Sequence, residues 1–396
     1  MALSVHPPLF LRYRCTPSAP SFLTNTFSSL LTLTISKRQR FEPKRTRSAT
    51  PIFFLQSTHK TTSCNTSNYM RQDSCLIFPP LPPTKPLAII QFFGGAFIGA
   101  IPEVTYSYLI ELLAKQGFLI VSVPYDVTFD HSLAASEVHR RFNSCLDNLM
   151  SFGLPYAGLK ASDLEGLPLY SIGHSNGALL QVLVGSYFSH RLPKANAIIS
   201  FNNRPASEAV PYFEQFGPLV HQATPIIDES PIYTLAASAT GDALNVILDV
   251  AGALTVGSDP NAIVSLNKFV DQLPAVLNQV SQGISEFRPT PSENREFIKQ
   301  SYNVPHTLLV KFSDDGIDES DLLESILRPR VDAICGKLEN VILSGNHITP
   351  CTQDIKWQVG ESYTPVDAFA QGLKSWSLND VRTLAKSIGD WLKCIS

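Results

Sequence analysis

The sequence has 396 residues and lacks features that mark two large classes of protein. Its formal net charge is only −3, and it has no basic stripe with interleaved aromatic residues, so nothing in its charge favours binding to nucleic acid. No run approaches the 18 uncharged apolar residues of a transmembrane helix. The nearest candidate, residues 243–256, is short and carries Asp249. We therefore expect no membrane-spanning segment, although peripheral membrane contact stays open.

Metal and cofactor patterns are also missing. The seven cysteines form no C-x-x-C pair and no Cys/His spacing typical of zinc, so we expect reduced, mostly buried thiols in an intracellular compartment. The glycines at 94, 95 and 99 do not have the spacing of a dinucleotide-binding loop, and no phosphate-binding P-loop occurs. The prediction is a protein with no metal and no cofactor.

Acidic residues are scarce at the N-terminus. The first is Glu42 and the next is Asp73, whereas eight Arg and Lys residues precede position 48, among many Ser and Thr. This composition is typical of an organellar transit peptide. We expect residues 1–60 to lie outside the fold and to direct the protein to the chloroplast, with the mitochondrion as the alternative. A merely disordered tail is the other interpretation.

What the sequence does have is a regular alternation of short apolar strands and helices. Strands are expected at 87–92, 118–123, 167–172, 197–201, 306–312 and 341–343, and helices at 104–116, 133–150, 178–188, 321–335 and 380–392. Such alternation predicts an α/β fold with a mostly parallel central sheet and helices on both faces. The rhythm stops over residues 203–300, which we interpret as a helical cap or lid inserted between the core segments 74–202 and 301–396.

A G-x-S-x-G pentapeptide, residues 173–177, lies between an expected strand and an expected helix. This context is that of a nucleophile elbow, a tight turn that lifts the hydroxyl of Ser175 clear of the sheet. A serine hydroxyl needs a base and an orienting acid in order to attack a carbonyl. Ser175 is therefore the candidate nucleophile. His174, locked beside it, is expected to have a supporting role.

Both partners follow in the expected order. An aspartate-rich loop begins after the strand 306–312, and Asp315 is the preferred acid, with Asp314 as the alternative. His347 follows the last strand and is the candidate base. The alternatives are a solvated turn for the aspartates and a loop histidine that bonds a backbone carbonyl.

The remaining element of the chemistry is a site for negative charge. A glycine-rich turn at Gly94, Gly95 and Ala96 follows the first core strand, and its backbone N–H groups, with that of Asn176, are the candidate oxyanion donors. Asn202 and Asn203 follow another strand. They either bind substrate or anchor the insertion.

These motifs resemble a plant and cyanobacterial family catalogued as domain of unknown function 1350. The resemblance covers roughly residues 74–396 and rests on segments 94–100, 124–126, 173–178, 201–203 and 345–350. It implies an α/β-hydrolase fold, a plastid transit peptide in plant members, and Ser175, His347 and an acid among Asp314 and Asp315 as the site. It implies no substrate. Similar sequences usually carry a histidine at the position of Gln91.

The leading hypothesis is a plastid serine hydrolase that cleaves an ester, thioester or lipid acyl bond. The apolar composition of the insertion favours an apolar substrate. A non-catalytic scaffold or apolar-ligand carrier on the same fold is the alternative, because a fold does not imply an activity. A transferase that passes the acyl group to an alcohol is a third interpretation.

Overall fold

The computed structural model describes residues 69–209, 276, 279, 282–354 and 365–395. Its centre is an eight-stranded sheet with the spatial order β1-β2-β4-β3-β5-β6-β7-β8. β2 runs antiparallel to β4, and the strands from β4 to β8 are parallel. The strands are β1 (Met70–Gln72), β2 (Cys75–Phe78), β3 (Ala88–Phe93), β4 (Phe118–Ser122), β5 (Leu169–His174), β6 (Ala195–Ile199), β7 (His306–Phe312) and β8 (Lys337–Leu343).

The central strands are buried on both sides. Every residue of β3, β4 and β6 is buried, as expected for parallel strands that helices cover on both faces. The parallel strands end at one edge of the sheet, and their carboxyl ends lead into the loops that carry the candidate site residues. This shared edge is where open α/β sheets bind ligands.

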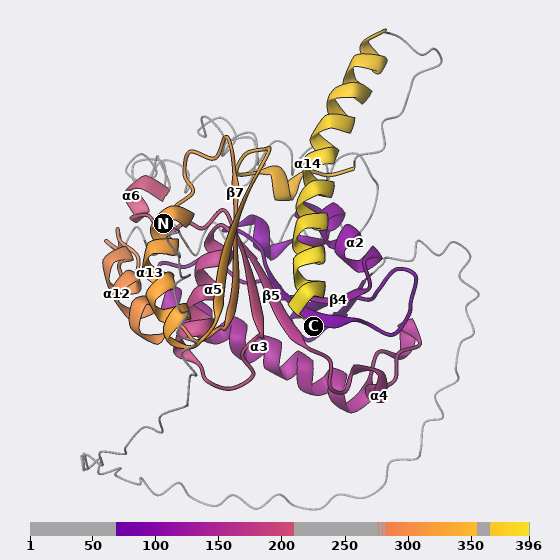
Figure 1. The fold of residues 1–396 in the computed structure, drawn as a ribbon, viewed down its shortest axis with the longest axis horizontal. Helices are drawn as coiled ribbons and strands as arrows, with labels where there is room; N and C mark the ends of the chain where they lie inside the picture. The colour runs from indigo at the N-terminus through magenta and orange to yellow at the C-terminus, as the bar shows by residue number, and fades with distance from the viewer. Residues whose placement is uncertain (1–68, 210–275, 277–278, 280–281, 355–364, 396) are drawn as a thin grey trace, which may run out of the picture. The chain divides into compact units, whose positions relative to one another are not determined.

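Helices cover both faces of the sheet (Figure 1). One apolar core joins the sheet to α3, α4, α5, α12 and α13, and a second joins it to α2 and α14. The longer helices are α2 (Ser107–Lys115), α3 (His131–Phe152), α5 (Asn176–Tyr187), α12 (Pro291–Ser301), α13 (Ser320–Ala333) and α14 (Pro365–Ile395). The short helices are η1 (Ile98–Ala100), α1 (Pro102–Thr105), η2 (Pro155–Ala157), α4 (Ala161–Leu164), α6 (Ala206–Ala209) and η3 (Thr349–Cys351).

Local sequence explains where two of these helices begin. The Asp130 carboxylate accepts the Leu133 N–H at 2.8 Å and caps α3. A reciprocal capping box between Thr290 and Glu293, with Pro291 in the first turn, starts α12. α12 packs against α5 and α13. Most of the expected cap, residues 210–275, lies outside the described residues, so the interpretation of 203–300 as a lid stays a prediction.

The strand order with one antiparallel strand near its start, and helices on both faces, is that of the α/β-hydrolase fold. The predicted fold class is therefore confirmed. None of the described helices combines the length and the apolar character that crossing a bilayer requires.

Several elements differ from their predictions. The predicted helix 104–116 is two helices, α1 and α2, which meet at Tyr106, where φ is −122°. The hairpin of β1 and β2 was not predicted and extends the sheet to Met70, before the expected start at residue 74. β8 begins at Lys337 and α14 at Pro365, both earlier than expected. In β8, exposed residues interrupt the apolar pattern that the prediction relies on.

Candidate active site

The turn between β5 and α5 carries Ser175. This residue has φ 56° and ψ −123°, a strained conformation for a residue other than glycine. The turn is held from two sides. The Ser175 N–H donates to the Ile199 carbonyl at 3.0 Å, and Gly177 lies so close to the backbone of Phe93 and Gly94 that a Cβ atom would overlap their carbonyl oxygens. The sequence G-x-S-x-G thus folds as a nucleophile elbow.

His347 follows β8 and contacts the serine. Its Nε2 lies 2.9 Å from Ser175 Oγ, the separation that proton transfer from the hydroxyl requires. The loop is turned by Asn346 and Thr349: the Asn346 N–H donates to Thr349 Oγ1 at 2.8 Å, and the Thr349 N–H donates to the Asn346 carbonyl at 3.0 Å. The side chain of His347 is 21% exposed, so it is open to a substrate.

Asp315 meets the other nitrogen of the same ring. Its Oδ2 lies 2.9 Å from His347 Nδ1, and its Oδ1 accepts the Ile317 N–H at 3.1 Å. Because a carboxylate only accepts, Nδ1 carries the proton and Nε2 is free to accept one from Ser175. Burial raises the pKa of Asp315, but the hydrogen bond and charge of His347 and the Ile317 amide outweigh burial, so the pKa lies below its usual value.

Asp314 stands apart from this pair. It is exposed, and its carboxylate accepts the Ser313 hydroxyl at 2.9 Å, while its N–H donates to the Gly345 carbonyl at 3.0 Å. That backbone bond joins the loop after β7 to the loop after β8. Of the two aspartates that the sequence left open, the structure therefore brings Asp315 to His347.

The glycine-rich turn after β3 lies against the elbow. A Cβ atom on Gly95 would stand 3.3 Å from Ser175 Cβ. The sequence named the Gly95 amide as an oxyanion donor, but this N–H donates to the Tyr106 hydroxyl at 2.7 Å. Within the described residues, no hydrogen bond occupies the N–H of Ala96 or of Asn176. These two amides are thus available donors, whereas that of Gly95 is not, and Gly94 contributes its carbonyl to a bond with Tyr125 at 2.9 Å.

His174 is buried beneath the elbow, 1% exposed. Its Nδ1 lies 2.7 Å from the Tyr106 hydroxyl and its Nε2 lies 2.9 Å from the His347 carbonyl oxygen. Burial and the neighbouring His347 lower the pKa of His174 to about 3, against weaker opposing effects. This histidine is neutral near pH 7, and its two described hydrogen bonds go to Tyr106 and the His347 carbonyl, not to the Ser175 hydroxyl.

A third histidine belongs to the site, and the sequence did not single it out. His131, the first residue of α3, places its Nε2 3.1 Å from Asn176 Nδ2 and stacks on Phe287 with ring centroids 4.4 Å apart. Burial lowers the pKa of His131 to about 4. Asn176 Oδ1 also accepts from the Tyr125 hydroxyl at 3.0 Å. No local pattern marks His131, because it meets the elbow only through the tertiary fold.

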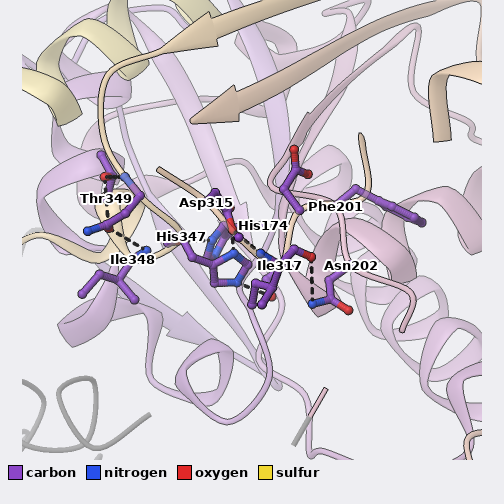
Figure 2. A network of polar contacts seen from close by, with 12 residues as sticks. His174, Phe201, Asn202, Asp315, Ile317, His347, Ile348 and Thr349 are labelled. Carbon is purple, nitrogen blue, oxygen red and sulfur yellow. Dashed lines mark hydrogen bonds and ion pairs between the residues drawn. The ribbon is translucent and has the colours of Figure 1, made fainter. Parts of the chain in front are cut away.

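Asn202 and Asn203 bond to the protein itself. The Asn203 side chain, 4% exposed, donates to the Pro291 carbonyl and accepts from Asn294, each at 3.1 Å, and so holds the start of α12. Asn202 Nδ2 lies 3.5 Å from the Ile317 carbonyl oxygen (Figure 2). These contacts favour anchoring over substrate binding. In the part of the chain that the structure describes, no cluster of three or more His, Cys, Asp or Glu side chains could hold a metal ion.

The fold and the site together define an α/β-hydrolase fold protein with a Ser-His-Asp arrangement at the carboxyl edge of its sheet. Within this class, the chain belongs to the family described as "Protein of unknown function (DUF1350)", whose model matches residues 79–394. No curated protein matches the sequence.

Several solved structures are similar at low identity. A thioesterase domain from the curacin biosynthetic pathway shares 14% identity over 78% of this chain and 98% of that chain, with a TM-score of 0.36. A lipase in its open form shares 13% identity over 80% of this chain and 98% of that chain, with a TM-score of 0.39. The esterase domain of a Rhodothermus marinus protein shares 15% identity over 78% of this chain and 92% of that chain, with a TM-score of 0.34. Similarity at this level says nothing about a substrate.

Proposed function

We propose that the protein is a serine hydrolase that cleaves a carboxylic ester, thioester or lipid acyl bond. The observation that carries the proposal is the unbroken chain from Ser175 Oγ to His347 Nε2 and from His347 Nδ1 to Asp315 Oδ2, each contact at 2.9 Å. Each member has the partner that its role requires: a nucleophile with a base, and a base with an orienting acid.

The mechanism follows from these contacts. Ser175 Oγ attacks the acyl carbon as His347 Nε2 takes its proton, and Asp315 holds the ring and stabilises its cationic form. The N–H groups of Ala96 and Asn176 stabilise the oxyanion, an effect of roughly 3 kcal/mol for each donor. His347 returns the proton to the leaving group. Water then attacks the acyl-enzyme by the same route and releases the acid.

An apolar acyl group is the substrate class that the surroundings of the site favour. Phe97 follows the glycine-rich turn after β3 (Gly94–Ala96), which we call the oxyanion turn. It packs with an apolar cluster that comprises Val127, Phe129, Ala206, Val276, Ile284 and Phe287. Phe287 stacks on His131, which contacts Asn176 beside the nucleophile. Apolar side chains beside a few convergent polar groups are typical of small-molecule sites.

A chain-length series of p-nitrophenyl esters tests this proposal. We expect hydrolysis by the protein, higher kcat/KM for butyrate or longer esters than for acetate, and loss of activity by a factor of roughly 10⁶ in Ser175→Ala. Turnover that persists in Ser175→Ala, or none in the parent protein, would refute the hydrolase. Ester binding without turnover would instead support a ligand carrier, and ester product formed with an added alcohol would support a transferase.

We also propose that residues 1–60 direct the protein to the chloroplast, with the mitochondrion as the alternative. The basic, acid-poor and hydroxyl-rich composition of this segment supports the proposal. A fusion of the first 70 residues to a fluorescent reporter is expected to enter plastids in plant cells. A reporter that stays in the cytosol would contradict this localisation.

A further inference from the structure

Four groups that the chain brings together from distant positions form one hydrogen-bonded line beneath the candidate site. The Gly95 N–H donates to the Tyr106 hydroxyl at 2.7 Å, that hydroxyl lies 2.7 Å from His174 Nδ1, and His174 Nε2 lies 2.9 Å from the His347 carbonyl oxygen. The line runs from the glycine-rich turn after β3 to the loop of the proposed base, and one of its members, His174, directly precedes Ser175 in the chain.

Only one arrangement of protons satisfies every member of the line. A carbonyl oxygen only accepts, so His174 Nε2 carries the ring proton. His174 Nδ1 then accepts, and Tyr106 gives it the single hydroxyl proton. The Tyr106 oxygen is left to accept from Gly95. The direction of all three bonds is therefore fixed by chemistry, without a choice of tautomer.

Burial makes this line rigid. Tyr106 is 0% exposed and His174 is 1% exposed, and the Tyr106 ring packs edge-on against Phe92 with centroids 5.1 Å apart. A buried polar group without its partner costs about 1–3 kcal/mol, so movement of one member away from the next is disfavoured. Both groups stay uncharged near neutral pH, because burial raises the pKa of Tyr106 and lowers that of His174.

We infer that His174 and Tyr106 are positioning residues, which hold the His347 main chain and the oxyanion turn in register with Ser175. The inference rests on the proposed function. His174 cannot itself be the base, because the Tyr106 hydroxyl and the His347 carbonyl occupy both of its nitrogens. Instead, His174 bonds the main-chain carbonyl of His347. This bond fixes the position of the His347 backbone, and thereby the position of the His347 ring relative to Ser175.

The positions of the His347 loop and the oxyanion turn relative to Ser175 have a large effect on the rate of acyl transfer to the serine. A misplacement of about 1 Å at a reacting group can reduce the rate by roughly 10²-fold. His347 follows the edge strand β8. Apart from the bonds of the His347 ring to Ser175 and Asp315 and that of its carbonyl to His174, the described hydrogen bonds of residues 344–348 lie within this loop and the following η3 or join the loop to that of Asp314. The bond to His174 ties the loop to the buried interior beneath the elbow.

The test uses variants that remove or restore the line. His174→Leu removes both bonds, and Tyr106→Phe removes the hydroxyl alone. His174→Gln restores them, because an amide carries one acceptor and one donor at a spacing close to that of the two ring nitrogens. Tyr302→Phe is the matched control for tyrosine: its hydroxyl is also fully buried and bonds Asn196 and Thr307, each at 2.9 Å, near the opposite ends of the strands. His139→Leu, on α3, is the control for histidine.

Two rates are measured for each variant: p-nitrophenyl butyrate hydrolysis, and labelling by a fluorophosphonate probe. We expect His174→Leu to lower kcat and the labelling rate roughly 10- to 100-fold, with KM changed less than about twofold. We expect Tyr106→Phe to lower both rates roughly tenfold. The rates of the double variant should be no lower than those of His174→Leu, because both changes break the same line of hydrogen bonds. His174→Gln recovers most of the rate, and both controls match the parent protein.

The inference is overturned if folded His174→Leu keeps the parent kcat and labelling rate, or if His174→Gln is as slow as His174→Leu. Where His174→Leu does not fold, a parent rate in Tyr106→Phe overturns it. These outcomes differ from a failure of the proposed function, in which the parent protein itself is not labelled or Ser175→Ala is labelled equally.

Discussion

Three histidines surround one serine, and their environments separate their roles. His347 is partly exposed and has a nitrogen toward Ser175 and another toward Asp315. His174 and His131 are buried, and burial lowers their pKa to about 3 and about 4. A residue that is neutral throughout the working range cannot stabilise a proton taken from serine. The identical side chain is therefore the proposed base at one position and a neutral hydrogen-bonding group at the others.

The two aspartates of the loop after β7 allow a direct test at this scale. Asp315→Asn keeps the size of the side chain but presents an amide to His347 Nδ1, which favours the wrong tautomer. We expect kcat to fall by roughly 10³- to 10⁴-fold. Asp314→Asn, next in sequence, is expected to stay within about twofold of the parent, because Asp314 bonds Ser313 and faces solvent. Steady-state ester hydrolysis measures both, and equal losses would contradict the assignment of Asp315.

The low pKa of His174 predicts how stability depends on pH. The unfolded chain binds a proton at this histidine near pH 6.5, whereas the folded protein does so only near pH 3. Between these values the unfolded state holds more protons, so the free energy of unfolding falls as the pH is lowered. From pH 7.5 to 5 the fall is about 2 kcal/mol for this group.

His174→Gln has no such proton to bind. Its urea midpoint is expected to change less between pH 7.5 and 5 than that of the parent protein. Some slope remains, because His131 has a pKa lowered to about 4 and acts in the same direction. A parent and a variant with the same slope would show that His174 is not held neutral.

At the scale of elements, the elbow depends on how closely two turns approach. A methyl group at Gly177 would overlap the backbone of Phe93 and Gly94, and backbone has little freedom to move. We expect Gly177→Ala to destabilise the fold by about 2–3 kcal/mol and to abolish ester hydrolysis. Gly316→Ala is the stability control, because nothing lies within 4 Å of a Cβ atom there. Thermal unfolding of both variants checks this, and equal melting temperatures would contradict it.

Apolar periodicity predicted most of these elements. β7 was predicted with its observed bounds, and α5 and α13 within two residues. The hairpin of β1 and β2 was missed, because its strands have only three and four residues and precede a proline-rich stretch. The break between α1 and α2 was also missed. It lies at Tyr106, whose hydroxyl reaches Gly95 and His174, and contacts over 11 and 68 residues leave no local pattern.

The candidate site, too, was predicted where local patterns mark it and missed where only long-range contacts do. Ser175, Asp315 and His347 were accessible from sequence because each follows a strand, and strand ends of a parallel sheet converge. Their mutual contacts are what the structure adds. Tyr106 and His131 were not accessible, since a tyrosine between helices and a histidine at a helix start are ordinary core and capping positions. Because the position of Tyr106 could not be predicted, neither could its hydrogen bond with the Gly95 N–H.

At the scale of the whole molecule, the described fold lies in a compact unit from Ser67 to Ser396. A protein that starts at Ser67 is expected to unfold at the same urea concentration as the full chain. A protein that starts at Pro79 loses β2, whose Leu76 and Ile77 are fully buried. Each such side chain contributes roughly 1.5–3 kcal/mol. We therefore expect this shorter protein to be at least several kcal/mol less stable, and equal stability would contradict the observed sheet order.

The proposed hydrolase depends above all on activation of the Ser175 hydroxyl by His347. Fluorophosphonate labelling followed by mass spectrometry of the digested protein tests it most directly, because the probe forms a lasting bond with an activated serine. We expect one adduct, on the peptide that contains Ser175, which is absent in Ser175→Ala and forms much more slowly in His347→Ala. An unlabelled protein, or an adduct that persists in Ser175→Ala, would contradict it.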